Sequence, residues 1–496
     1  MQLQWDRTQI PAMGTVVQGV QNQEQTLEVR LGEDMPDIGY IICGWGQPLL
    51  RGKEWHADGI GVSGGIMVWI LYGPEDGSAP RCVEGWLPFQ LKWNLPPTER
   101  DGTICCDIRL RGVDARVLSA RKMMLRAQIS ALGEALVPTE VEYVSCGETP
   151  QHIQLDKRTY PVLLRAEAGE VAIVVDEDIP VPGVRPMKII SCTLESKLTE
   201  QKVVGSRVIF RGECSIHLNY FGEEGEIHSC DLRAPFAQYA QLDRDYDKQT
   251  AVEALIAVSS LEPELTEEGL RLKCTLVCQY KILEQHRIEA VQDAYSTKHE
   301  IELTLHSATI PAVLDQRTER RSIQQTGPGE MGQIIDTCLY MEQPVMRRNG
   351  NNVDMQLPGS VQVLSRDANG AYHGNTIRFA DQWSLYAEDH TALQWIAAAM
   401  DRPRALSGGE GIEVQCDLEL QLCATAYQTI PQIGEIRVGQ EKQMSRERPS
   451  MILRRPGDAS LWQLAKQYGS TVEQIRQANG LEEGIPKDKM LLIPIA

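Results

Sequence analysis

The sequence carries many side chains that could do chemistry, but their spacing matches no catalytic or metal-binding pattern. Nine histidines and thirteen cysteines are spread over 496 residues. A zinc protease needs His-Glu-x-x-His on one helix, and a zinc-binding fold repeats a Cys-x-x-Cys pair; neither arrangement occurs. Cys105 and Cys106 are adjacent, and the spacing of Cys274 and Cys278 is not repeated. We therefore expect a protein that is not an enzyme, with no catalytic residue, no metal and no cofactor.

Two glycine-rich stretches could in principle hold a phosphate group. They are Asn349-Gly350 and Gly408-Gly409-Glu410-Gly411. A phosphate loop continues into Lys-Ser or Lys-Thr, and neither stretch does. Both are instead predicted to be hairpin turns, because Asn-Gly and Gly-Gly tolerate the positive φ of a tight turn.

The residues after 450 have the one clearly ordered set of elements. An apolar stripe at helical spacing comprises Leu461, Leu464, Ala465 and Tyr468. Two pairs fit the capping box at a helix start, Ser460 with Gln463 and Ser470 with Glu473. Apolar runs at 451–453 and 490–493 flank the two helices. The predicted order is strand, helix, helix, strand.

This segment resembles a LysM domain, in its turn Gly457-Asp458-Ala459-Ser460-Leu461-Trp462 and its turn Asn479-Gly480-Leu481. LysM domains recognise glycans that contain N-acetylglucosamine or, in some sporulation proteins, another protein. The resemblance implies a ligand groove between the two turns. Its walls are Gly457, Asp458, Ala459, Ser460, Leu461, Asn479, Gly480, Leu481, Ile485 and Pro486. Ala459 is an extra residue in the family pattern, and the first strand lacks the common Tyr-x-Val. The alternative is that these residues only form caps and turns.

The charge of the chain is unevenly distributed. The net charge is −19, yet residues 451–496 contain six Lys and Arg against five acids. The first 434 residues carry −21. A body this acidic is repelled by phosphate backbones and by anionic lipid, so we expect no nucleic-acid partner. The sequence has no apolar run long enough for a membrane helix and no secretory signal pattern, which predicts a cytoplasmic protein without a transmembrane segment.

The acidic body contains an internal repeat. Pro11, Pro161 and Pro311 are spaced by 150 residues, each in a similar apolar setting. An Ile-Ile pair followed by a cysteine comes about thirty residues after each proline, ending at Cys43, Cys192 and Cys338. The predicted domains are residues 1–145, 146–296 and 297–434, followed by a flexible linker over 435–450 and the LysM-like domain over 451–496.

Each repeat ends in a long segment of strictly alternating apolar and polar residues. In the third repeat the apolar positions are Ile412, Val414, Cys416, Leu418, Leu420 and Leu422. A period of two predicts a strand with one buried face. Residues 253–260 and 391–402 fit either short helices or further strands. The fold class is therefore mainly β, with three tandem antiparallel sandwich-like or barrel-like repeats followed by a small βααβ domain.

The first repeat contains a stretch, Gly65–Tyr72, that is apolar on both faces. A strand of this kind must cover its second face with something. Either another repeat covers it, or Met67, Trp69 and Leu71 form an assembly surface for a second copy or another protein.

The whole layout, three β-rich repeats and a C-terminal LysM, resembles spore-coat morphogenetic proteins of endospore-forming Firmicutes, whose repeats are SPOCS domains. The resemblance implies a scaffold in the mother cell at the forespore surface. It also implies that the LysM binds the coat ATPase stage IV sporulation protein A. The alternative is a LysM protein that binds peptidoglycan or its precursors.

Overall fold

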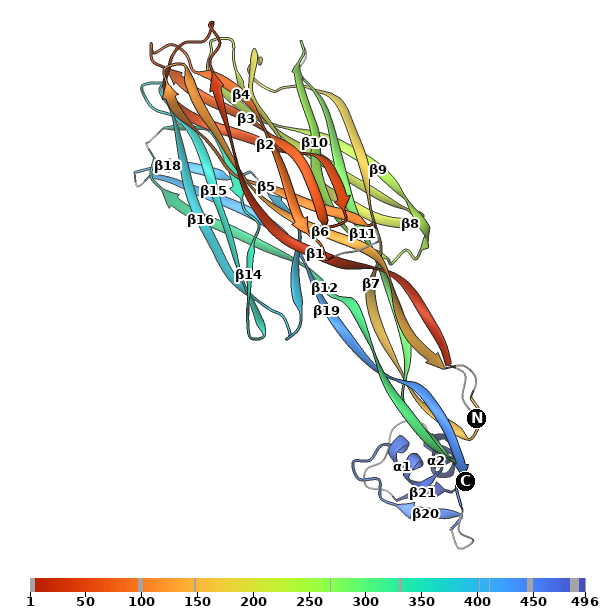
Figure 1. Ribbon diagram of the computed structural model, residues 1–496. Helices are drawn as coiled ribbons and strands as arrows, with labels where there is room; N and C mark the ends of the chain where they lie inside the picture. Colours follow the sequence, from red (N-terminus) through yellow and green to blue (C-terminus); the bar gives the residue numbers. More distant parts are fainter. Residues whose placement is uncertain are drawn as a thin grey trace.

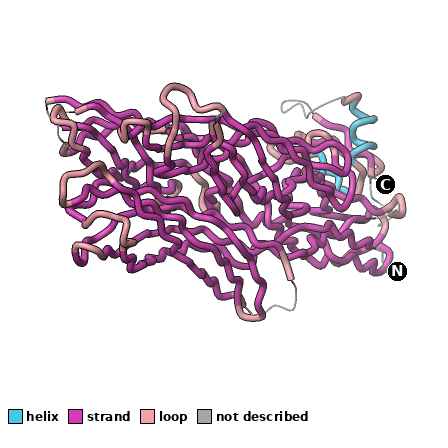
Figure 2. Tube along the Cα trace, turned by 90° about the horizontal axis from the view of Figure 1, so that it is seen from above, coloured by secondary structure: helices cyan, strands magenta, loops and turns pink. Residues whose placement is uncertain are grey.

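The computed structural model describes residues 5–96, 101–146, 149–267, 269–329, 332–400, 402–409, 411–443, 449–481 and 490–495. In this part of the chain nearly all regular structure is β-strand, with two short helices near the C-terminus. Figure 1 shows an elongated bundle of strands that carries both helices and both chain ends at one end. The view from above in Figure 2 shows the same separation of strands and helices. The predicted mainly-β fold is confirmed.

The strands fall into three consecutive units and a terminal module. The first unit contains β1 (Trp5–Arg30), β2 (Ile38–His56), β3 (Gly59–Pro74), β4 (Arg81–Asn94), β5 (Thr103–Ser119) and β6 (Lys122–Cys146). The second contains β7 (Ile153–Ile179), β8 (Lys188–Phe221), β9 (Ile227–Tyr246), β10 (Ala251–Leu265) and β11 (Leu270–Ser296). The third contains β12 (His299–Gly327), β13 (Gln333–Met341), β14 (Val345–Asn349), β15 (Asn352–Arg366), β16 (Tyr372–Tyr386), β17 (Ala392–Met400), β18 (Arg404–Gly408) and β19 (Gly411–Glu441). The module contains β20 (Met451–Arg454), α1 (Leu461–Tyr468), α2 (Val472–Asn479) and β21 (Leu491–Pro494).

The three units share one pairing pattern. In each, the first strand pairs antiparallel with the last: β1 with β6, β7 with β11 and β12 with β19. The strand or strands before the last one pair on its other side, and the remaining strands form a second sheet. The predicted domain boundaries after residues 145, 296 and 434 stay predictions, although the strand pairing repeats three times.

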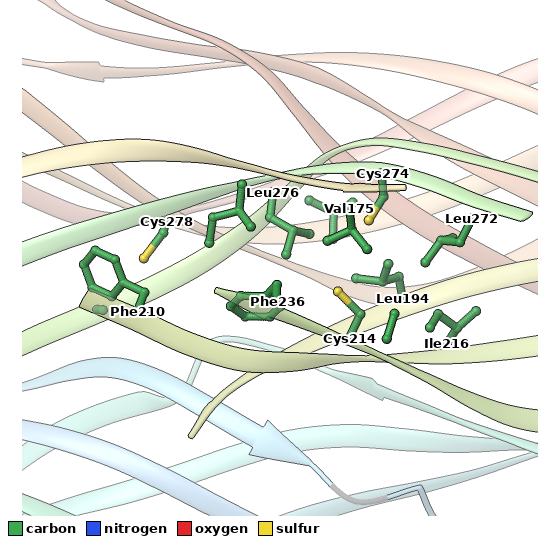
Figure 3. Packing of buried hydrophobic residues seen from close by; sticks show 14 of the residues in the cluster. Val175, Leu194, Phe210, Cys214, Ile216, Phe236, Leu272, Cys274, Leu276 and Cys278 are labelled. Carbon is green, nitrogen blue, oxygen red and sulfur yellow. The ribbon is translucent and has the colours of Figure 1, made fainter. Parts of the chain in front are cut away.

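Alternation along the strands builds the cores, as the period of two predicts. The six apolar positions of β19 from Ile412 to Leu422 are each at most 3% exposed. In the second unit, side chains of β8 and β9 pack with those of β7, β10 and β11. Figure 3 shows the part of this core in which Phe210 and Phe236 lie near residues of β7 and β11. Residues 253–260 and 392–400 are strand, not helix, and Gly350 and Gly411 at the two hairpin turns both have positive φ.

The units interlock, because each core includes a side chain from another unit. Leu49 of the first unit lies in the core of the second. Tyr340 of the third unit lies in the core of the first, where its hydroxyl donates to the carbonyl oxygen of Gly44 at 2.9 Å. Leu132 of the first unit packs against the core of the third. The three units therefore form one packed body.

The second apolar face of β3 is covered inside this body. Trp69 is 6% exposed, Leu71 is fully buried and Met67 is partly buried. Side chains of the other two units cover them: Ile190, Phe221, Ile227, Ile335, Cys338, Leu364 and Tyr372. The assembly surface predicted at Met67, Trp69 and Leu71 is therefore wrong, and the alternative of covering by neighbouring repeats holds.

A buried carboxylate joins all three units. Asp336 on β13 is 2% exposed and accepts hydrogen bonds from Trp45 Nε1 at 2.7 Å and Asn219 Nδ2 at 2.9 Å. Its other oxygen contacts Arg402 and lies 2.8 Å from His217 Nε2. Burial alone would raise the pKa of Asp336, but the charge and hydrogen bond of His217, the charge of Arg402 and the hydrogen bond of Trp45 lower it far below its usual value.

A second buried network links the first two units. Lys281 on β11 contacts the carboxylate of Glu134 on β6, and Arg165 on β7 lies 3.5 Å from the same group. Glu253 on β10 lies 3.6 Å from Lys281. Burial alone would raise the pKa of Glu134, but the charges of Lys281 and Arg165 lower it below its usual value. The network keeps buried charges paired, which is the condition for their burial.

The first part of the polar segment 435–450, which was predicted to be a linker, is a β-strand. β19 continues to Glu441 and stays paired with β12 through Val438 and Glu441. Lys442 then donates through Nζ to the carbonyl oxygen of Ser296 at 2.7 Å. The tether predicted over 435–450 is therefore strand over 435–441, because long alternating strands of the third unit extend past its core. Residues 444–448 lie outside the described part.

Candidate functional site in the C-terminal module

The first helix of the module begins where the capping box predicts. Ser460 Oγ accepts from the backbone N–H of Gln463 at 3.2 Å, and Gln463 Oε1 accepts from the N–H of Ser460 at 2.9 Å. Gly469, at φ 67°, ends α1 in the left-handed region. Leu461, Leu464 and Ala465 are buried in the module core, as the apolar stripe predicts.

The second helix begins one residue later than predicted. Thr471 Oγ1 accepts from the N–H of Gln474 at 3.1 Å, and Gln474 Oε1 accepts from the N–H of Thr471 at 3.1 Å. The predicted pair, Ser470 and Glu473, is wrong by one position. Ser470 is fully buried at the turn, and its N–H bonds back to Ala465, so it belongs to the end of α1.

The first wall of the predicted groove is the turn between β20 and α1. Gly457 has a φ of 58°, a conformation that favours glycine, and is exposed. Asp458 and Ser460 are also exposed. Ala459 is partly buried against the module core, and Leu461 is 7% exposed. The extra Ala459 therefore occupies the base of this wall.

The second wall begins at the end of α2. The side-chain amide of Asn479 donates to the carbonyl oxygen of Leu492 at 2.6 Å and accepts from the Leu492 N–H at 2.8 Å. Asn479 thereby fixes β21 to the end of α2. Gly480 is exposed at φ 60°, and Leu481 packs in the cluster that contains Leu461. Ile485 and Pro486 lie outside the described residues.

The module docks on the end of β11. Lys466 Nζ lies 2.6 Å from Asp293 Oδ1, and Trp462 Nε1 donates to Asp293 Oδ2 at 2.8 Å. Tyr295 donates its hydroxyl to the carbonyl oxygen of Ser470 at 2.8 Å, and its ring meets that of Trp462 edge-on at 4.8 Å. These polar contacts come from the outer face of α1 and from the turn between the helices. The exposed groove positions lie on other turns.

Electrostatics support this docking contact. Burial alone would raise the pKa of Asp293, but the hydrogen bonds from Lys466 and Trp462 and the Lys466 charge lower it below its usual value. Sequence reasoning missed Asp293 and Tyr295, because they look like any other residues near the end of a strand. It named Trp462 only as part of the LysM-like turn, although its indole N–H donates to Asp293 of the body.

The described residues contain no group of three or more His, Cys, Asp or Glu side chains placed to hold a metal ion. Their helices are also too short to cross a membrane. The described group that most resembles a catalytic one is His217, which lies 2.8 Å from Asp231 and 3.4 Å from the hydroxyl of Ser229. Its Nε2 faces Asp336, so this geometry serves the junction between units.

Comparison with known proteins bears on the module alone. Neither the curated proteins nor the solved structures gave a match to this chain. Residues 455–492 match the family model of the LysM domain, which suggests binding of peptidoglycan or a related glycan. The strand, helix, helix, strand order and the two capping boxes agree with that match. The chain carries a C-terminal LysM domain at residues 455–492.

Proposed function

We propose that this protein is a non-enzymatic scaffold that presents a LysM domain on a rigid β-body. The LysM groove binds the coat ATPase stage IV sporulation protein A, and the body spaces or joins further coat components. The layout is similar to SpoIVA-interacting protein L of clostridia and, more distantly, to stage VI sporulation protein D. The proposed location is the mother-cell cytoplasm, at the forespore surface.

The observation that carries the proposal is the way in which the LysM domain is held. Asp293 and Tyr295 bind α1 and the turn after it through hydrogen bonds and an ion pair, whereas Gly457, Ser460 and Gly480 stay exposed. A binding module fixed to a large body through a face other than its groove can hold a ligand at a set distance and orientation. Fixing the module in advance also lowers the entropy lost on binding.

Ala459 favours a protein ligand over a sugar. It adds a side chain at the base of the first groove wall, where it packs against the module core. A small sugar depends on a few precisely placed polar groups in a concave site, whereas a protein contact spreads over a larger surface and tolerates a reshaped rim. Glycan binding remains the second candidate, and the family match itself favours it.

A retention experiment with the full chain separates the two candidates. The immobilised chain is offered stage IV sporulation protein A and, separately, purified peptidoglycan. A groove variant combines Asp458→Arg with Leu481→Lys. The matched control combines Glu473→Lys with Gln477→Lys, which adds the same charge to exposed positions of α2.

We expect the protein ligand to be retained at least as well as the glycan, and only the groove variant to lose it. Equal melting temperatures of the two variants exclude unfolding as the cause. Retention of peptidoglycan alone supports the second candidate. Failure to retain either ligand contradicts both.

A further inference from the structure

The outer face of the LysM sheet is apolar and exposed. Leu453 on β20 lies opposite Leu492 on β21, and Met451 lies opposite Pro494. Because side chains alternate along a strand, these residues share the face that points away from the module core. Met451 is 57% exposed, Leu453 56% and Leu492 38%. We call Met451, Leu453 and Leu492 the sheet patch.

Nothing in the described body covers this patch. The module contacts the body through α1, and Figure 1 places β20 and β21 on the far side of the helices, at the end of the molecule. Arg454 and Arg455 follow Leu453 at the end of β20 and are exposed; Arg454 pairs with Leu491 and so lies on the other face of the strand, at the edge of the patch. An apolar face with a cationic border fits a surface that offers apolar side chains among carboxylates.

The far end of the second unit offers such a surface. Met187 is 58% exposed and Val184 37%. They lie beside the turn between β8 and β9, because the Met187 N–H donates to the carbonyl oxygen of Phe221 at 2.9 Å. That turn exposes Glu223 and Glu224. Further exposed acids at this end are Glu177, Asp178 and Glu267, against the exposed cations Arg185 and Lys188.

The two surfaces lie at opposite ends of one strand pair. Tyr295, which holds the LysM domain, pairs with Gln154, whereas Leu270 pairs with Ile179 beside the acidic end. A straight strand spans roughly 80 Å over that number of residues. The sheet patch therefore cannot reach the acidic end of its own chain. A second copy of the chain can bring the two surfaces together.

We propose that the sheet patch of one copy docks on the acidic end of the second unit of another copy. The contact joins two different surfaces, so it can repeat head to tail along a row of molecules or occur twice in an antiparallel pair. Repetition builds an open chain of molecules. The groove turns take no part in this contact, so the inference goes beyond the proposed ligand binding and does not depend on it.

Sedimentation velocity of the full chain tests this inference. We expect species larger than a monomer that grow with protein concentration at about 50 mM salt and shrink at about 500 mM, since salt screens the charged border. Leu453→Asp with Leu492→Asp should raise the dissociation constant at least about tenfold, because it places carboxylates in an apolar contact facing acids. The matched control is Leu305→Asp with Tyr427→Asp, at positions 74% and 71% exposed on the body.

Charge reversal identifies the partner surface. Arg454→Glu with Arg455→Glu should abolish the assembly, and adding Glu223→Arg with Glu224→Arg should restore it. A chain that stays monomeric at every concentration overturns the proposal, as does an assembly that the patch variants leave unchanged. A wild-type chain that does not self-associate but binds vesicles of phosphatidylserine and phosphatidylcholine overturns the proposal. If the patch variants lose this binding, the patch belongs to a lipid surface instead.

Discussion

Lys466 of the LysM domain lies 2.6 Å from Asp293 at the end of β11, and this ion pair sets how the module meets the body. The same carboxylate accepts from Trp462, and two residues further along β11 the ring of Tyr295 meets the indole edge-on. A module that is held at one helix face has a defined orientation. Because the orientation is defined, the groove faces its ligand from a fixed position on the body. A module on a flexible linker would not fix the groove in this way.

Removal of the Asp293 carboxylate should loosen the module. Asp293→Ala leaves Lys466 and the Trp462 N–H without their partner, and we expect docking to weaken by about 1–2 kcal/mol, with the exposure of Lys466 limiting the effect. Amide hydrogen exchange of α1 should rise in the variant, and small-angle scattering should show a longer molecule. Asp293→Asn, which keeps the acceptor for Trp462, should give a smaller change. Unaltered exchange in both would show that Asp293 does not hold the module.

The stability of the body should fall as pH rises through 9. Burial alone would lower the pKa of His217, but Asp336 and Asp231 raise it to about 9. The folded chain then keeps a proton that the unfolded chain releases near pH 6.5, so the stabilisation is fully present below pH 6.5 and lost by about pH 9. Its size is on the order of 3 kcal/mol. Urea unfolding across this range measures it.

His217→Gln is the control for that pH dependence. The neutral amide does not titrate, so the variant should lose most of the decline in unfolding free energy between these two pH values. The charged groups around the imidazole are Asp231, Asp336 and Arg402. The pKa of both carboxyl groups is lowered, so the carboxylates stay charged throughout the range. An identical decline in wild type and variant would assign it to other groups.

Loss of the Lys281 ammonium should be among the most damaging single changes in the body. Lys281→Met leaves Glu134 and Glu253 buried with less compensating charge, which costs about 3–5 kcal/mol. Lys273→Met, at an exposed position of the same strand, should stay within about 0.5 kcal/mol of wild type. Lys281→Met combined with Glu134→Gln should recover part of the loss. Chemical denaturation compares the three, and equal costs at positions 281 and 273 would contradict the buried network.

Three thiols of the folded body should resist alkylation. Burial raises the pKa of Cys82, Cys192 and Cys278 to about 12 each. Because the thiolate is the reactive form, we expect iodoacetamide at pH 8 to modify them at least about a hundredfold more slowly in the native chain than in urea. Mass spectrometry of the peptides reads each site separately. Rapid native modification of Cys278 would mean that the core of the second unit opens.

Much of the fold could be predicted from local patterns. The alternation from Ile412 to Leu422 predicted a strand with one buried face, because burial on a pleated strand has a period of two. Ser460 with Gln463 predicted the start of α1 for the same local reason, since a capping box spans four consecutive residues. At Ser470 and Thr471 the sequence offers two adjacent cap residues, and the αL turn at Gly469 places the second one at the helix start.

Contacts between units could not be predicted in this way. Trp69 is apolar on a strand with two apolar faces, and the pattern alone cannot say whether the cover comes from Leu364 of the third unit or from another molecule. Asp336 looks like an ordinary polar residue until Trp45, His217 and Arg402 converge on it. Asp293 is a similar case. Most of these contacts join residues more than a hundred positions apart.

The most direct test of the account is a hydrogen-exchange footprint of the full chain with stage IV sporulation protein A bound. The account predicts protection of the turns around Gly457–Leu461 and Asn479–Leu481, with α1 already protected by its contact with Asp293. Protection confined to the β-body, with both LysM turns unchanged, would contradict it.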